Sequence, residues 1–143
     1  MKKTIIKWSI ILAALIIFIC CINFSRGRWI IPAQVERVVF QGYTSCDGPI
    51  SDTVELTDSE IRKLVFNYNC ASYAGEVTAD SCTSEFSFTF YLRDGSRIYA
   101  GDAHTRNPRI EVSPPHGERY WIKSKALADY AQELIEKYDL TVS

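Results

Sequence analysis

Residues 85–92 read EFSFTFYL, and large apolar side chains alternate there with mostly polar ones. Successive side chains of a strand point to opposite faces, so the three phenylalanines and the leucine share one face. This period of two predicts a strand with one buried and one open face. Asp94-Gly95 follows at once and is typical of a tight hairpin turn, which predicts a partner strand over 97–100.

Further strands and two helices surround this hairpin. β-branched and aromatic residues predict strands over 35–41, at 110–112 and over 120–123. Thr57-Asp58-Ser59-Glu60 is a capping box, which predicts a helix from there to about Asn69. Residues 124–138 predict a second amphipathic helix, with Ser124 as its N-cap. The order β-α-β-β-β-β-α predicts an α+β fold, a small antiparallel sheet with two helices packed on one face.

Residues 5–24, IIKWSIILAALIIFICCINF, form a nearly unbroken apolar run. As a helix they would cover about 30 Å, the thickness of a bilayer's hydrocarbon core. Three lysines lie before or near the start of the run (Lys2, Lys3 and Lys7) and two arginines follow it (Arg26 and Arg28), which slightly favours a cytoplasmic N-terminus. We therefore expect a membrane anchor over 1–24 held in the lipid bilayer, a linker over 25–34 and an extracytoplasmic α+β domain over 35–143. The protein would then be a single-pass protein of the cell membrane.

Two alternatives for the apolar run lead to the same compartment. A cleaved secretory signal needs small residues at the cut, and the best position, after Ser25, has Asn23 at −3. A lipoprotein signal needs a small residue before its cysteine, whereas Ile19 precedes Cys20 and Cys20 precedes Cys21. The sequence favours an uncleaved anchor and leaves cleavage and lipidation open.

Charge is unevenly distributed along the chain. The residues from 30 onward carry 11 basic and 17 acidic side chains, a formal net charge of −6. A domain of this charge is repelled by phosphate backbones, which argues against binding to nucleic acid. The same charge is compatible with a basic protein or envelope partner.

Three cysteines fall in the predicted domain: Cys46, Cys70 and Cys82. An oxidising compartment permits one disulfide among them and leaves one cysteine over. All three pairings are open, and Cys70–Cys82 is favoured because it closes a short polar loop, which we predict over 71–81 between a helix and a strand. All three being reduced is the alternative.

Few residues suggest catalysis. Asp102, His104 and His116 are residue types that zinc accepts, and Cys46 is a further candidate nucleophile, but their spacing matches no established metal or catalytic motif. We therefore expect solvent-exposed loop histidines, no cofactor and no enzyme activity. A small metal-dependent or cysteine-dependent enzyme built on these residues is the alternative.

Aromatic residues outside the phenylalanine face suggest binding instead. Tyr91, Tyr99, Tyr120 and Trp121 come from three predicted strands, and tyrosine and tryptophan are enriched where proteins bind partners. Packing between neighbouring strands is the competing explanation. The sequence thus predicts a membrane-tethered binding domain without catalytic activity, such as an inhibitor or immunity-type protein. A structural subunit of a membrane complex is a further possibility.

Overall fold

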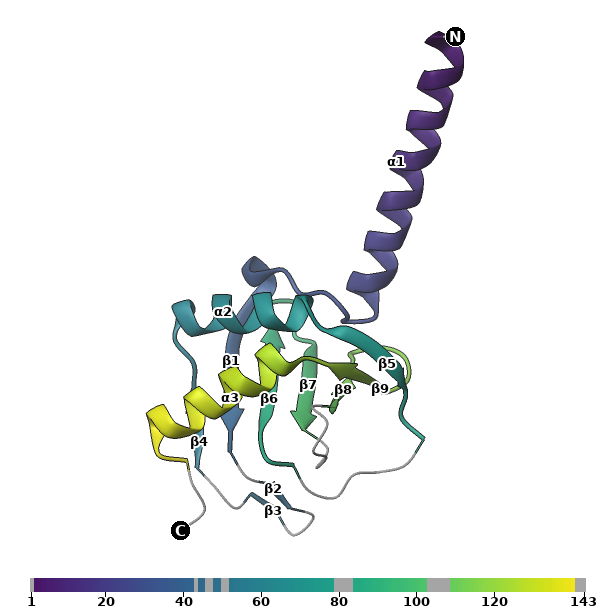
Figure 1. The fold of residues 1–143 in the computed structure, drawn as a ribbon. Helices are drawn as coiled ribbons and strands as arrows, with labels where there is room; N and C mark the ends of the chain where they lie inside the picture. The colour runs from purple at the N-terminus through teal and green to yellow at the C-terminus, as the bar shows by residue number, and fades with distance from the viewer. Residues whose placement is uncertain are drawn as a thin grey trace.

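The computed structural model describes residues 2–42, 44–45, 48–49, 52–78, 84–102 and 109–140. A long helix, α1 (Lys2–Ser25), projects away from an α+β body (Figure 1). The body contains a short 3-10 helix and two α-helices: η1 (Pro32–Gln34), α2 (Asp58–Asn69) and α3 (Lys125–Tyr138). Its strands are β1 (Val35–Gln41), β2 (Thr44–Ser45), β3 (Gly48–Pro49), β4 (Thr53–Glu55), β5 (Ser72–Glu76), β6 (Ser87–Leu92), β7 (Arg97–Asp102), β8 (Arg109–Ser113) and β9 (Tyr120–Lys123).

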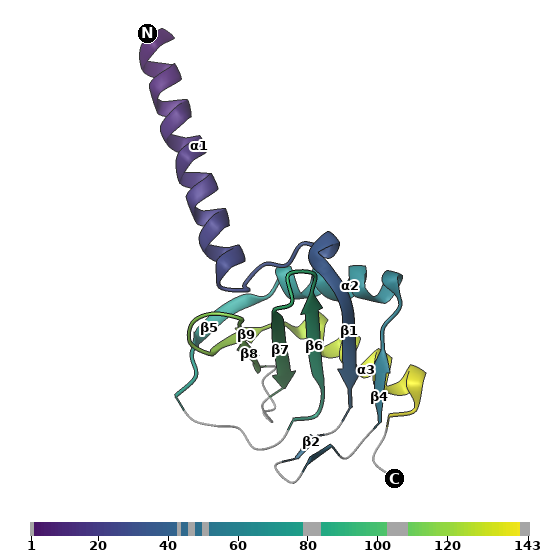
Figure 2. The same ribbon diagram turned by 180° about the vertical axis from the view of Figure 1, so that it is seen from behind.

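Within the described residues, seven strands form one sheet in the order β4-β1-β6-β7-β8-β9-β5, and every pairing is antiparallel. Strands β2 and β3 form a separate two-stranded ladder. Both α2 and α3 lie on the same face of the large sheet, which Figures 1 and 2 show from opposite sides. The predicted α+β class, with its N-terminal apolar helix and its order of elements, is confirmed.

The alternating strand β6 organises the core as the sequence predicts. Phe88 pairs with Phe40 on β1, and Phe90 packs against Tyr68 of α2 with 5.4 Å between ring centroids. Phe86, Phe88 and Phe90 are all buried. The apolar faces of the two helices cover them with Ile61, Leu64, Val65, Tyr68, Leu127, Tyr130, Ala131, Leu134 and Ile135.

The predicted helix and turn signals are present. Thr57 and Glu60 form the capping box of α2, in which the Thr57 amide donates to Glu60 Oε2 at 2.8 Å. Ser124 Oγ accepts from the Leu127 amide at 3.0 Å and caps α3. Gly95 adopts a φ of 83° in the turn between β6 and β7, a conformation that glycine adopts without strain.

The two edge strands of the sheet, β4 and β5, were not predicted from the sequence. The prediction of a loop over 71–81 is wrong for residues 72–76, which form β5 at one edge of the sheet. Strand β5 lacks an apolar alternation because it is an edge strand with a bulge between Tyr73 and Glu76. The opposite edge is β4, only three residues long. The sheet therefore ends on short or irregular strands on both sides.

The predicted linker is packed against the body rather than free. Residues 26–30, called the junction below, follow α1 and turn at Gly27, whose φ is 64°. Asn69 holds the buried Ile30 by two hydrogen bonds, accepting from its amide at 2.8 Å and donating to its carbonyl at 2.7 Å. The Tyr68 hydroxyl donates to the Gly27 carbonyl. The junction therefore fixes the end of α1 to the body.

Helix α1 has the length and composition of a membrane span. Its segment Thr4–Phe24 covers 21 residues, and none of its most apolar window is buried inside the protein. A helix that is apolar all round and has no core contacts leaves its surface to an apolar environment. By length and composition, α1 can cross a membrane.

Candidate functional site

The sheet has one surface that neither helix covers, here called the open face. It carries the side chains that alternate with the core residues along each strand, and Figure 2 shows it from the side opposite the helices. Tyr91 of β6, Tyr99 of β7 and Trp121 of β9 lie on it, each half-buried. Three of the four aromatic residues predicted for a binding surface therefore share one face.

Tyr120 lies on the other face of the sheet. It is 4% exposed, pairs with the core residue Val112, and its Oη lies 3.2 Å from Tyr68 Oη. Burial raises the pKa of Tyr120 above its ordinary value, and burial together with the neighbouring Tyr120 raises the pKa of Tyr68 well above it. The sequence already indicates that Tyr120 is buried. It lies two residues from Ile122 on the same strand, so the two side chains share one face, and isoleucine is a typical core residue.

Arginine side chains accompany the aromatic ones on the open face. The Arg37 guanidinium lies over the Tyr91 ring, 3.9 Å from its centroid, in a cation–π contact. Arg37 also approaches Glu55 of the edge strand at 3.8 Å, but both side chains are well exposed, so this ion pair contributes little. Arg37 and Tyr91 thus form a preordered aromatic and cationic pair.

The Tyr99 ring lies over Gly101, two residues further along the same strand. A Cβ placed on Gly101 would lie 2.5 Å from Tyr99 Oη and 2.9 Å from the ring carbon that bears it. A larger residue at this position would displace the Tyr99 ring from its place over the strand. Gly101 in turn faces Glu111 of β8, which faces Trp121 of β9.

Glu111 is the least exposed charged side chain described on this face. Its side chain is 11% exposed, and its Oε1 accepts from Arg119 Nη1 at 2.8 Å. A charge this close to burial needs such a partner, since its desolvation would otherwise be unfavourable. The pair stabilises the central surface between Tyr99 and Trp121.

A groove of about 860 Å³ runs over part of the open face. Tyr91 and Tyr99 line it together with Arg97, the turn between β6 and β7, and the loop Pro114–His116. Among the described residues, no carboxylate forms a salt bridge with Arg97. The groove therefore combines two aromatic rings with a positive charge that no carboxylate of the described residues neutralises.

The open face differs in charge from the domain as a whole. Among the residues that the structure describes, strand parity and the Glu111–Arg119 contact place five basic and two acidic residues on it, against a net charge of −6 for residues 30–143. The net charge of the domain conceals this local excess of basic residues, although the alternation of side chains along the strands predicts it directly. The residues are Arg37, Arg97, Arg109, Arg119 and Lys123, against Glu55 and Glu111.

Of the three candidate metal ligands, the structure describes the positions of Asp102 and His116, and it does not bring them together. Asp102 ends β7 beside Ile110, whereas His116 lies in the loop beyond Ser113, which pairs with Tyr99 near the start of β7. Tyr99 and Asp102 are three residues apart along β7, about 10 Å at roughly 3.3 Å per residue, and His116 lies a further three residues beyond Ser113. Among the described residues, no group of three or more potential metal ligands is found. His104 lies outside the described residues.

Of the three cysteines in the predicted domain, the structure describes Cys70. Cys70, the C-cap of α2, is exposed, and its thiol forms no disulfide with any of the other cysteines that the structure describes. Cys46 and Cys82 lie outside the described residues, so a disulfide between Cys70 and Cys82 stays a prediction, as does a nucleophilic Cys46.

No family model, curated protein or solved structure matches the chain. The function of the protein is therefore inferred from the open face, the junction and α1 themselves.

Proposed function

We propose that the protein is a single-pass membrane protein whose α+β domain binds a protein partner through the open face, without catalysing a reaction. Helix α1 is then the uncleaved anchor, with the N-terminus in the cytoplasm and residues 35–143 on the extracytoplasmic side. The observation that carries the proposal is the open face itself. Tyr91, Tyr99 and Trp121 stay partly exposed on one surface, which also carries the exposed Arg97, while the helices bury the other surface.

Aromatic and arginine side chains favour this role because of how they bind. Both types are enriched at the centre of protein interfaces, where they bury large areas with little loss of conformational freedom. Tyr91 is already ordered by Arg37, and Tyr99 by its position across Gly101. Less entropy is therefore lost when a partner orders these side chains.

The charge of the open face supports a proposal for the chemistry of the partner. The net charge of the domain alone predicts a basic partner, but the surface that carries the aromatic residues has a local excess of basic groups. Complementarity acts between the surfaces that meet, so the open face favours an acidic protein surface. We place an acidic partner ahead of a basic one, and an inhibitor or immunity role is one form of this function.

The orientation of the open face suits a partner beside the protein. Strands β1, β6 and β7 run roughly along the direction of α1, so the sheet stands upright relative to the anchor (Figures 1 and 2). A membrane-anchored or envelope-bound partner would meet the open face sideways. Anchoring both molecules in one layer raises their effective concentration and permits a modest intrinsic affinity.

Site-specific photo-crosslinking in cells tests the proposal. A photoreactive phenylalanine replaces Tyr91 or Tyr99, and Phe66 is the matched control because it is an aromatic residue, 68% exposed, on α2. We expect one shared product from positions 91 and 99, identified by mass spectrometry, and none of it from position 66. We also expect Arg97→Glu to abolish the product. Equal capture from position 66, or capture that Arg97→Glu leaves unchanged, would contradict an open-face interface.

A further inference from the structure

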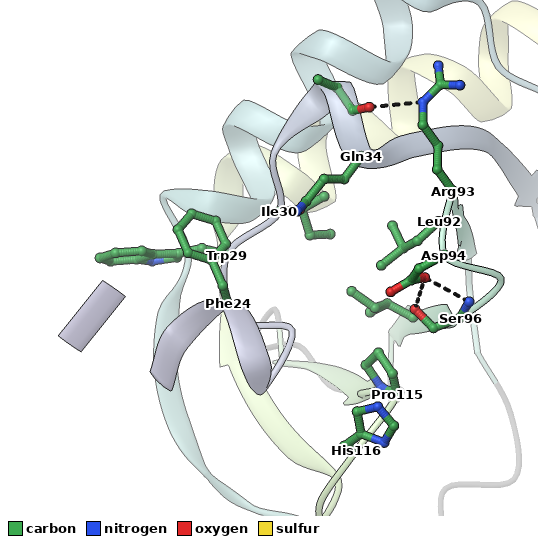
Figure 3. Close-up of a pocket in the computed structure, with 12 residues that line it drawn as sticks. Phe24, Trp29, Ile30, Gln34, Leu92, Arg93, Asp94, Ser96, Pro115 and His116 are labelled. Carbon is green, nitrogen blue, oxygen red and sulfur yellow. Dashed lines mark hydrogen bonds between the residues drawn. The ribbon is translucent and has the colours of Figure 1, made fainter. Parts of the chain in front are cut away.

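A second cavity lies where the anchor meets the body. It has a volume of about 480 Å³, within the range of small-molecule sites, and Figure 3 shows its lining. Phe24 and Trp29 form one wall, and Leu92, Ile98 and Pro115 of the body face them. Polar side chains also line it, including Arg93, Ser96 and His116. The cavity thus combines apolar walls with a few polar side chains, and it is called the juxtamembrane pocket below.

The pocket is continuous with the apolar surface of the anchor. Phe24 is the last residue of the span Thr4–Phe24, and Trp29 packs edge-on against it with ring centroids 5.9 Å apart. Phe24, Trp29 and Ile31 are all exposed hydrophobic residues. If α1 spans a bilayer, this end of the helix lies where acyl chains meet headgroups, the depth at which tryptophan is enriched. An apolar path therefore leads from the lipid into the body of the protein.

The pocket is held open by fixed neighbours. Asn69 anchors Ile30, which lines the pocket. Gly27 packs closely against the body, because a Cβ added to it would lie 3.1 Å from Ile98 and 3.4 Å from Pro115. On the opposite side, Arg93 Nε donates to the Ala33 carbonyl at 2.9 Å (Figure 3). Asp94 is engaged in its own turn, where its carboxylate accepts from the amide and hydroxyl of Ser96. A preformed apolar cavity at this depth is suited to a hydrocarbon chain.

We propose that the juxtamembrane pocket binds one acyl chain of a phospholipid from the surrounding bilayer, with the lipid headgroup near Arg93 and His116. The proposal depends on α1 being a membrane anchor, as in the proposed function. A guanidinium and an imidazole beside the apolar walls suit a lipid phosphate, since both can donate hydrogen bonds to it. The bound lipid would lie between the anchor and the body and would add a second attachment of the body to the membrane.

Photolabelling of the full chain in liposomes tests this proposal. The liposomes contain phosphatidylcholine with a diazirine partway along one acyl chain, and labelled peptides are mapped by mass spectrometry. We expect labelling within α1 and also within residues 92–98, which form part of the pocket wall. Ala33→Phe, at an exposed position that lines the pocket, should remove the labelling of residues 92–98 and leave that of α1 unchanged. Ala126→Phe, at an exposed position on α3, is the matched control and should change neither.

The outcomes separate the pocket from the anchor. Labelling of α1 with none in residues 92–98 would overturn the pocket and leave the anchor in place. Labelling of residues 92–98 that persists in a folded Ala33→Phe protein would also overturn it, because the label would then report surface contact. Absence of label from α1 would overturn the anchor and the pocket together. Circular dichroism of each variant confirms that the fold is intact.

Discussion

Replacement of Glu60 by glutamine should destabilise the protein in a pH-dependent way. Glu60 begins α2 but also holds the end of α3, because its carboxylate accepts from Lys137 Nζ at 2.6 Å and from Tyr138 Oη at 3.0 Å. The Thr57 amide donates to it as well. Glutamine keeps the size and can still accept two of these bonds, but it removes the charge that Lys137 pairs with.

The size of the effect follows from the pKa of Glu60. Burial alone would raise this pKa, but hydrogen bonds from Lys137, Thr57 and Tyr138 outweigh burial and lower it from 4.5 to about 2. That difference corresponds to about 3 kcal/mol of folding free energy. Because the Lys137 side chain is 57% exposed, solvent screening reduces the contribution to about 1–2 kcal/mol.

The sign of the pH dependence is fixed by the direction of this change. The folded pKa lies below the unfolded one, so the stabilisation is complete above pH 4.5 and is lost as the pH falls toward 2. The difference in stability between the wild type and Glu60→Gln should therefore be largest near neutral pH. It should shrink steadily below pH 4.5.

Urea unfolding of the full chain in detergent, followed by tryptophan fluorescence, measures this difference across the pH range. Glu133→Gln is the matched control, because Glu133 pairs with Lys63 between two well-exposed side chains and should change stability by less than about 0.5 kcal/mol. The reasoning is refuted if Glu60→Gln is as mild as the control near neutral pH, or if its effect does not fall as the pH is lowered.

Three further predictions concern other contacts. Asn69→Ala leaves both backbone groups of the buried Ile30 without their partner, so we expect a loss of about 2–4 kcal/mol in urea unfolding and faster proteolysis at the junction. Gly101→Ala forces its Cβ against the Tyr99 ring and should lower stability by about 1–3 kcal/mol, and most of this loss should disappear in a Tyr99→Ala background, measured as a double-mutant cycle. Tyr68 has a pKa raised by burial, so folding stability should fall as the pH rises above 10, and Tyr68→Phe should show a smaller fall in unfolding experiments at alkaline pH.

Each of these predictions has a matched control. Asn67→Ala alters the same helix at a position outside the junction and should leave proteolysis unchanged. Tyr91→Ala removes a different aromatic ring from the open face and should not relieve the Gly101→Ala variant. Wild-type stability that is flat across alkaline pH would contradict the account of Tyr68.

Patterns local in sequence predicted most of the fold. The alternation around Phe88, the capping box at Thr57 and the Asp94-Gly95 turn each depend on neighbours within a few residues, and each is present as expected. Edge strand β5 carries no such pattern, because it pairs on one side only and contains Gly75 and a bulge. Its place beside β9 is a long-range contact that periodicity does not encode.

The candidate site was predictable in part for the same reason. Strand parity separates Tyr120 from Trp121 and collects the arginines on the open face, so that much was available from the sequence. The junction was not available, because Asn69 and Ile30 are 39 positions apart and their pairing depends on the whole fold. The pocket also brings together distant segments around Phe24 and Ile98.

The two edges of the sheet have a consequence for chains crowded within one bilayer. Confinement to a plane multiplies encounters between neighbouring copies, and an exposed strand edge invites a neighbour to extend the sheet. Strand β4 offers only three residues to such a neighbour, and β5 has an interrupted register. If α1 anchors the chain in a bilayer, copies that collide there meet a short strand at one edge of the described sheet and an interrupted one at the other, which disfavours pairing of sheets between copies.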